Sequence, residues 1–423
     1  MLAVIGIALY ALPGLMSYDS AFQLDEARRW DLGDQHPPLM SAIWRLCEVF
    51  VSGPLGMLVL QVGALIAGLG ILLARELSAR RAAAATLAIS WYPPVLVVMA
   101  VIVKDAQMAG YLVLGIALLM APRRWPRWAG LGALVVASAM RHNAPAATLA
   151  PIVLLWARDA APAWRRWLVG ALAWLAVTAA SFGITAVLTN DPGTGFGDII
   201  RVTDIIGTVR YAEPLSDAEL HELLAGTRLR VDRDIQAEFA AHYEPRIYLE
   251  FTQHPQPLEV STTDAEREAV ARAWRAIVLR EPLAYLHHRW EIFQHVLDLH
   301  AASTPPPFQT PLSPEVLTGA ELGQLRPTSP SFIQRAAARA VRGIGAVWYV
   351  PFVYFAVGLC LLPLARTRLE LALLGSGLLY ELGMFPVALS ADYRYSHWLI
   401  LSVIVAAVLI FARRYRAAAP ARG

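Results

Sequence analysis

YDSAFQLDEARRWDLGDQHPPLMSAIW, residues 18–44, separates the first apolar segment of the chain from a long series of further apolar segments. The stretch carries five acids and one histidine, and a rigid Pro-Pro pair closes its polar part. Polar groups beside membrane segments are costly unless they line a protected cavity. This loop is therefore predicted to hold part of a site, and the rest of the chain decides on which side of the membrane the loop lies.

Composition places the chain among membrane proteins. Of its 423 residues, 57% are hydrophobic and 16% are charged, and the mean hydropathy is +0.47. Soluble domains carry about a quarter charged residues. Repeated apolar runs near the length of a bilayer crossing predict an all-α polytopic membrane protein with about ten transmembrane helices. The net charge of +3 gives no argument for a nucleic-acid partner, and the two cysteines form neither a disulfide framework nor a metal-ligand spacing.

Arginine-rich connections follow every second apolar segment. The candidate spans are 1–16, 54–74, 82–103, 106–121, 127–141, 144–157, 167–189, 344–364, 369–389 and 396–412. Short basic connections stay in the cytoplasm. The alternation therefore predicts a multi-pass protein with both termini cytoplasmic, and it places the odd-numbered connections, including the loop at 18–44, outside.

The topology divides the chain into three parts. Residues 1–189 form an N-terminal transmembrane module that includes the first external loop (17–53), and residues 344–423 form a C-terminal transmembrane module with a cytoplasmic tail. Residues 190–343 form a mainly helical extracytoplasmic domain, in which Thr262 or Thr263 caps a long helix that the Glu281-Pro282 pair interrupts. Within the first loop, PLMSAIWRLCEVF (38–50) is amphipathic and too short to span, which predicts an interfacial helix.

The first loop contains two candidate catalytic acids, Asp19 and Asp34. A carboxylate that is partly desolvated at the membrane edge can have a raised pKa and can remove a proton from an acceptor hydroxyl. His36 could bind a sugar or phosphate or orient Asp34, and Gln23 is a further candidate for substrate binding. The alternative for Asp19 is a helix cap or a solvated loop acid, and for His36 a surface position.

Three cations, Lys104, Arg141 and Arg394, are predicted at the outer ends of other spans. Lys104 is followed by Asp105. A buried arginine at this depth needs an anionic partner, and a phosphate is a suitable one because guanidinium binds it through two nitrogens. The alternatives are a lysine that only reaches toward the interface, an ion pair of Arg141 with Asp105 or Asp392, and an aromatic belt around Arg394. The candidate substrate-binding residues outside the first loop are Lys104, Asp105, Arg141, Asn143, Asp392, Arg394 and Tyr395.

Familiar nucleotide and hydrolase motifs are missing from the sequence. No P-loop, GxSxG, HExxH or nucleotide-binding glycine motif is convincing. An enzyme whose site faces outward cannot draw on cytoplasmic nucleotide sugars and would need a lipid-carried donor. His288 and His295 could share a helix face, but they have no acidic partner at ligand spacing, so zinc is not predicted.

In combination, these residues resemble the membrane glycosyltransferases of the C superfamily, which use polyprenyl-phosphate sugars. The matching parts are the acidic first external loop, the Lys104-Asp105 pair, R-H-N at 141–143 and the Arg-Tyr pair at 394–395. The resemblance implies an inverting transfer from an undecaprenyl-phosphate sugar to a lipid, glycan or protein acceptor at the periplasmic face of the bacterial inner membrane.

The resemblance also implies roles for the residues. Asp19 or Asp34 would be the base or bind the acceptor, and the three cations would hold the lipid phosphate. Asp105 could support a divalent metal, Mg²⁺ or Mn²⁺. A transporter or flippase for a lipid-linked glycan, or a non-catalytic assembly subunit, is the alternative. A transporter would need polar residues on both faces, whereas those of this chain gather at the outer edge, without an inverted repeat.

Overall fold

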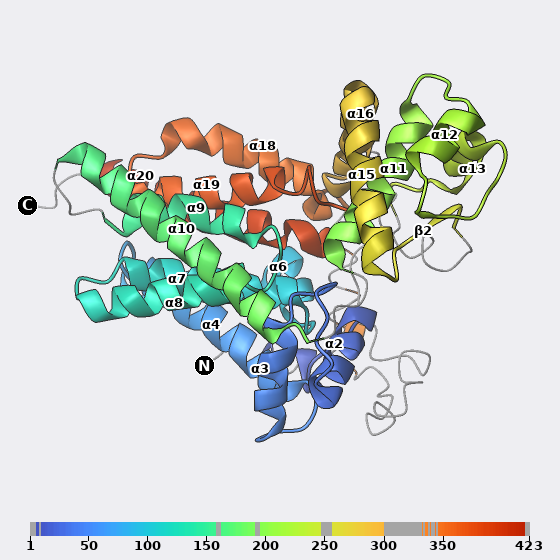
Figure 1. Ribbon diagram of the computed structural model, residues 1–423. Coiled ribbons are helices and arrows are strands. Elements are labelled where there is room, and N and C mark those ends of the chain that lie inside the picture. The colour runs from blue at the N-terminus through green and yellow to red at the C-terminus, as the bar shows by residue number, and fades with distance from the viewer. Residues whose placement is uncertain are drawn as a thin grey trace, which may run out of the picture.

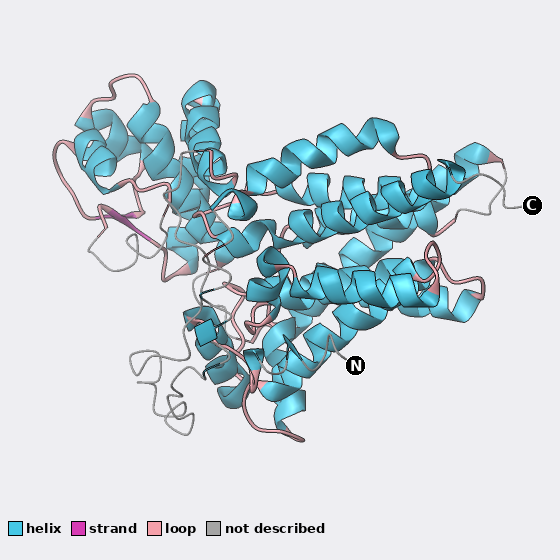
Figure 2. Ribbon diagram, turned by 180° about the vertical axis from the view of Figure 1, so that it is seen from behind, coloured by secondary structure: helices cyan, strands magenta, loops and turns pink. Residues whose placement is uncertain are grey.

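A bundle of roughly parallel helices, with a smaller group of helices at one end, makes up the protein (Figure 1 and, from behind, Figure 2). The computed structural model describes residues 6–7, 10–157, 162–190, 195–246, 256–299 and 346–418, with the single positions 332, 335, 336, 339 and 343. The Pro-rich stretch STPPPFQTPLSP (303–314), which the sequence indicates to be a loop, lies outside these ranges.

The bundle is built from both ends of the chain. Its N-terminal helices are α2 (Tyr18–Arg29), α3 (Leu39–Glu48), α4 (Leu55–Leu73), α5 (Ala79–Trp91), α6 (Pro93–Met99), α7 (Lys104–Leu119), α8 (Arg124–Ser138), α9 (Ala144–Leu155) and α10 (Ala163–Leu188). Its C-terminal helices are η3 (Ala346–Tyr349), α18 (Pro351–Leu361), η4 (Leu362–Leu364), α19 (Arg368–Leu382), η5 (Tyr393–Ser396) and α20 (His397–Ala418). Each candidate span from 54–74 onward overlaps at least one of these helices.

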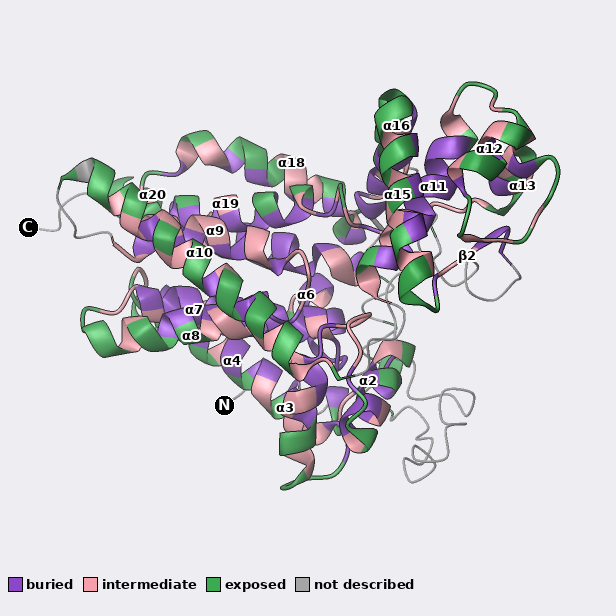
Figure 3. Cartoon of the chain, in the orientation of Figure 1, coloured by how far each residue is buried: buried purple, intermediate pink, exposed green. Residues whose placement is uncertain are grey.

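Length and composition identify the helices that can cross a bilayer. Three described helical segments pass this test by themselves, at Leu55–Leu73, Trp164–Leu188 and Tyr393–Ala418, and the bent pair α5–α6 makes a fourth. Only 11% of the most apolar window of α10 is buried, and Figure 3 shows exposed residues along the whole helix. An apolar surface of this length suits contact with lipid.

The third candidate span is broken twice. The axis turns by 69° between α5 and α6, where Pro93 and Pro94 follow Tyr92, and adjacent prolines are a common cause of such a kink. The chain then unwinds before α7, and Gln61 Nε2 donates to the carbonyl oxygens of Met99 (2.8 Å) and Val101 (3.0 Å). Gln61 thus supplies a donor to two carbonyl groups of the unwound stretch, of which Val101 O also accepts from Val103 N at 3.0 Å. The break ends at residue 104, the first residue of α7.

The first loop folds into two helices, α2 and α3. Ser17 caps α2, because its Oγ accepts from Ser20 N while Ser20 Oγ accepts from Ser17 N. Asp19 therefore lies in the first turn and is not the cap, so that alternative is wrong. Ser20 Oγ also donates to the carbonyl of Ile102. This bond joins the loop to the unwound stretch before α7.

Glu26 lies on α2, and its side chain is buried. Its carboxylate accepts from Ser41 Oγ (2.9 Å) and from Gly33 N (3.4 Å), yet burial raises the pKa of Glu26 to about 7. An unfolded glutamate has its usual pKa of 4.5. The folded protein therefore binds more protons than the unfolded chain between these two values, and stability falls as pH rises through that window.

Glu26→Gln is expected to stabilise the protein at pH 8 by about 1–2 kcal/mol, because it removes a buried charge, and to have little effect at pH 4.5. The thermal midpoint, measured over this pH range, checks it. Glu48→Gln is the matched control. The pKa of Glu48 is lowered, since hydrogen bonds and charge from Arg28 outweigh its burial, so this variant should destabilise the protein at neutral pH. An equal gain from Glu26→Gln at both pH values would contradict the expectation.

The smaller group of helices lies between α10 and α18 in the sequence. It contains α11 (Phe196–Tyr211), α12 (Asp217–Leu223), β1 (Arg228–Leu229), α13 (Ile235–His242), β2 (Leu258–Glu259), α15 (Asp264–Arg280) and α16 (Pro282–Val296), and β1 pairs antiparallel with β2. It has its own apolar core, around Val202, Ile205 and Phe239. Of the two predicted caps of α15, the structure has Thr263. The break at Glu281-Pro282 is as predicted, whereas α11 was not predicted.

Candidate active site

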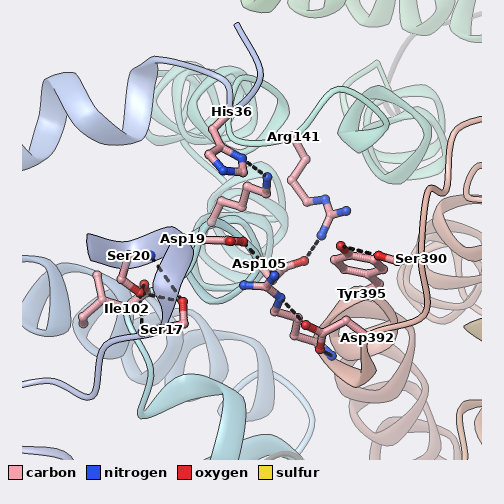
Figure 4. A network of polar contacts seen from close by, with 12 residues as sticks. Ser17, Asp19, Ser20, His36, Ile102, Asp105, Arg141, Ser390, Asp392 and Tyr395 are labelled. Atoms are coloured by element: carbon pink, nitrogen blue, oxygen red, sulfur yellow. Dashed lines mark hydrogen bonds and ion pairs between the residues drawn. The ribbon is translucent and has the colours of Figure 1, made fainter. Parts of the chain in front are cut away.

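A cavity of about 570 Å³ lies where the first loop, the ends of several bundle helices and the smaller group of helices meet. After the predicted topology, this smaller group, α11 to α16, is called the external helices. Figure 4 shows Asp19, His36, Arg141, Tyr395 and Asp392 pointing toward a common space. The predicted residues that line the cavity are Asp19, His36, Lys104, Arg141, Asn143, Asp392, Arg394 and Tyr395. They come from segments that are separated by up to several hundred positions in the sequence.

Arg394 joins two carboxylates of the cavity. Its Nη2 lies 2.7 Å from Asp19 Oδ2, and its Nε lies 2.8 Å from Asp392 Oδ2. Asp392 also caps η5, because its Oδ1 accepts from Arg394 N at 3.1 Å. The two ion pairs therefore hold the Arg394 guanidinium between Asp19 and Asp392.

Lys104 has a neutral partner. Its Nζ lies 2.7 Å from His36 Nδ1. Burial, and then the charge of Lys104, lower the pKa of His36 to about 3, so the imidazole is neutral and accepts from the ammonium group. Within the described ranges, no carboxylate lies within 4.0 Å of Lys104. Its charge is thus the least directly matched of the three cations.

Arg141 is held by an acid and a ring. Its Nη1 pairs with Asp105 Oδ1, and its guanidinium carbon lies 4.6 Å from the ring centroid of Tyr395. The Tyr395 hydroxyl lies 3.3 Å from Ser390 Oγ. The ion pair with Asp105, raised above as an alternative, is present, and Arg141 lines the cavity as well.

The charge around Asp19 determines its ionisation. Burial raises the pKa of Asp19, but the charges of Arg394 and Lys104 and the hydrogen bond from Arg394 lower it more, so the pKa lies well below its usual value. Asp19 is therefore an ionised and weakly basic carboxylate in the cavity as it stands. A bound anion that pairs with the same cations would reduce their effect on Asp19.

The structure does not bring three predicted residues into the lining. Asp34 Oδ1 accepts from Phe196 N at 3.3 Å, at the start of α11. Asp105 lies behind Arg141, and the Gln23 side chain is buried with no hydrogen-bond partner in the described part of the chain. Asp34 thus contacts the N-terminus of α11, where the helix dipole stabilises a carboxylate.

Several lining residues were missed by the sequence analysis. His142 stacks on Phe196 with 4.3 Å between ring centroids, and its Nε2 lies 3.0 Å from the carbonyl oxygen of Asp34. Burial lowers the pKa of His142 to about 4, so it is neutral near pH 7. Arg246 and Ile199 complete this side of the cavity. Only the position of His142 inside the R-H-N motif was a signal in the sequence.

A divalent metal does not fit the residues around Asp105. This carboxylate is paired with Arg141, a cation that opposes a second positive charge. Within the ranges that the structure describes, no three His, Cys, Asp or Glu side chains lie close enough together to hold a metal ion. Asp105 is therefore not assigned as a metal ligand.

The fold and the cavity define a helical, multi-pass membrane protein with a polar site at one end of its bundle. No known protein-family model matches the chain, and no curated protein matches it significantly. Two crystal structures of ArnT from Cupriavidus metallidurans resemble it, one bound to undecaprenyl phosphate and one in the apo state. Each is 16% identical, with TM-scores of 0.34 and 0.33, and the alignments cover 98% and 97% of this chain and 77% and 76% of ArnT. At these values the likeness leaves the function to be argued from the site itself.

Proposed function

We propose that this protein is an integral membrane glycosyltransferase that moves a sugar from a polyprenyl phosphate, such as undecaprenyl phosphate, to an extracytoplasmic lipid, glycan or protein acceptor. One observation carries the proposal. Three cations from separate segments share a single cavity with an ionised carboxylate of the first loop, at the end of an apolar bundle. This arrangement suits a substrate with an anionic head and an apolar tail.

The donor phosphate binds at Lys104. This residue opens α7, where the helix dipole favours an anion, and its neutral partner His36 leaves its charge available. Arg394 and Arg141 lie around the same cavity and can add charge-assisted hydrogen bonds. These cations also stabilise the charge that develops on the phosphate as it leaves.

Asp19 is the base in this proposal. The acceptor oxygen attacks the anomeric carbon from the side opposite the phosphate, and the bond between carbon and phosphate oxygen breaks with its electron pair. The acceptor proton passes to Asp19, and the configuration at the anomeric carbon inverts. Donor binding prepares this step, because the phosphate offsets the cations that lower the pKa of Asp19.

The membrane arrangement follows from the arginine pattern. About ten spans with both termini in the cytoplasm place the cavity at the outer face of the bacterial inner membrane. The apolar tail of the donor lies in the bilayer beside the bundle. On this arrangement α3 lies along the interface, where Leu46, Val49 and Phe50 expose large apolar side chains at its end.

Release of polyprenyl phosphate tests the proposal. Purified protein in nanodiscs is incubated with a radiolabelled polyprenyl-phosphate sugar and a cell-envelope acceptor fraction. The expected result is free polyprenyl phosphate together with labelled acceptor. Label that only changes side in proteoliposomes, with the donor intact, would establish the transporter instead. Neither change would favour the assembly subunit.

A further inference from the structure

Three external helices meet at one buried carboxylate, that of Asp204 on α11. Its Oδ2 accepts from Trp274 Nε1 of α15 at 2.8 Å. Its Oδ1 lies 3.1 Å from His288 Nε2 and 2.6 Å from Arg289 Nη2, both on α16. The side chains of Asp204, His288 and Arg289 have no exposed surface.

The charge of Asp204 is balanced by Arg289. Burial lowers the pKa of His288, and its Nδ1 lies 2.9 Å from the Tyr243 hydroxyl, so a neutral imidazole that donates to Asp204 and accepts from Tyr243 fits both contacts. A buried carboxylate is costly without a charged partner. The ion pair therefore fixes the guanidinium of Arg289 in one position.

The other end of this guanidinium reaches the cavity wall. Arg289 Nη1 donates to the carbonyl oxygen of Ala388 at 3.0 Å. Ala388 lies in the connection between α19 and η5, and residues 387–391 of that connection all line the cavity. We name these residues the wall segment. A second bond attaches it to the external helices, because Ala391 N donates to the carbonyl oxygen of Arg246 at 3.0 Å.

The wall segment leads directly into the charged part of the cavity. Asp392 follows it in the chain and pairs with Arg394, which in turn pairs with Asp19. The contacts thus run without interruption from the core of the external helices to the proposed base. The wall segment lines the cavity together with Phe196, Ile199 and Arg246 of the external helices. On the function proposed above, this is the part of the cavity where an extracytoplasmic acceptor binds.

We propose that Arg289 is a positioning residue, which Asp204 anchors and which holds the wall segment where the acceptor binds. Arg289 has no exposed surface and does not line the cavity, so it acts through Ala388 and touches no substrate. For its catalytic effect, the inference rests on the glycosyltransferase function proposed above. The hydrogen bond between Arg289 and the wall segment does not depend on that function.

Arg289→Lys separates the two contacts. A lysine keeps the charge beside Asp204, but its single nitrogen cannot replace the guanidinium fork that bridges Asp204 and Ala388. In nanodiscs, hydrogen exchange is expected to accelerate about 10-fold at the Ala388 and Ala391 amides, through loss of one charge-assisted hydrogen bond to the wall. The KM for acceptor should rise about 10-fold, while kcat and donor affinity change less than about 2-fold.

Trp274→Phe is the matched control. It removes a different hydrogen bond to Asp204 and leaves the bond between Arg289 and Ala388 in place. It should lower the thermal stability of the external helices without changing exchange in the wall segment or the acceptor KM. If Arg289→Lys does not fold, the neutral pair Asp204→Asn with Arg289→Gln replaces it, with the same expected release of the wall.

Unchanged exchange in the wall segment of the folded Arg289 variant would overturn the inference, as would equal acceleration in the Trp274 control. Faster exchange with an unchanged acceptor KM would show that Arg289 holds the wall segment but does not position it for the acceptor. Failure of the glycosyltransferase function has a different signature. The wild-type protein would then release no polyprenyl phosphate, whereas the exchange measurement would still decide whether Arg289 holds the wall.

Discussion

Asp19→Asn should lower kcat for sugar transfer by about 10³-fold, within the range expected for loss of a general base. The amide is nearly the same size as the carboxylate but cannot take up the acceptor proton. Donor binding should be unchanged or tighter, because Arg394 loses one of its two carboxylate partners and keeps only Asp392. Single-turnover transfer with a polyprenyl-phosphate sugar, beside a donor-binding titration, separates the two effects.

Two further substitutions in the same loop are controls for this result. Asp25 lies on α2 with Asp19 but pairs with Arg29 at 3.2 Å, so Asp25→Asn should leave kcat within about 2-fold of wild type. Asp34→Asn keeps an oxygen that can accept from Phe196 N, so it should lose less than about 10-fold. An equal loss of activity in Asp34→Asn and Asp19→Asn would mean that the cavity lining does not identify the base. Full activity of Asp19→Asn would end its assignment.

Lys104→Gln is expected to weaken donor binding by about 10- to 100-fold, which corresponds to one charge-assisted contact with the phosphate. Glutamine can still form a hydrogen bond to His36 Nδ1, so the surrounding structure should be kept. The rate of transfer should fall as well, because Lys104 also stabilises the leaving phosphate. Binding of polyprenyl phosphate to detergent-solubilised protein, followed by isothermal titration calorimetry, measures the change in affinity.

Arg45→Gln provides the charge-matched control for Lys104→Gln. Arg45 lies on α3 outside the cavity, where its Nη1 donates to the carbonyl oxygens of Ala27 and Arg28. Its loss removes one positive charge from the first loop, which borders the cavity, without touching the proposed phosphate site. Equal weakening in both variants would mean that the donor responds to the general positive charge around the cavity. Wild-type affinity in Lys104→Gln would place the phosphate elsewhere in the cavity.

Local signals in the sequence were sufficient for most of the helices. The kink after α5 follows from two adjacent prolines, and the start of α15 from a threonine followed three residues later by a glutamate. Both depend on neighbouring residues, and both are present in the structure. By contrast, α11 was missed, because glycines and aspartates at its start resemble a turn while its apolar residues pack against helices that come later in the chain.

The site could be predicted in outline and not in its contacts. The alternation of arginine-rich connections predicts that Asp19, Lys104, Arg141 and Arg394 lie on one side of the membrane, and the structure brings all four to one cavity. Membership of one side does not say which groups touch. That Asp34 contacts the start of α11, and that Arg141 pairs with Asp105 and not with Asp392, are properties of the packed structure.

The sequence by itself determined that residues 18–44 form a polar stretch among apolar segments, and it predicted that this stretch is external, because hydrophobic length and the placement of arginines can be read along the chain. Only the tertiary structure decided what the loop faces. The contacts of Asp19 with Arg394, and of Ala388 with Arg289, join residues that are about 100 or more positions apart. Such contacts depend on how whole helices pack, and that packing involves every helix at once.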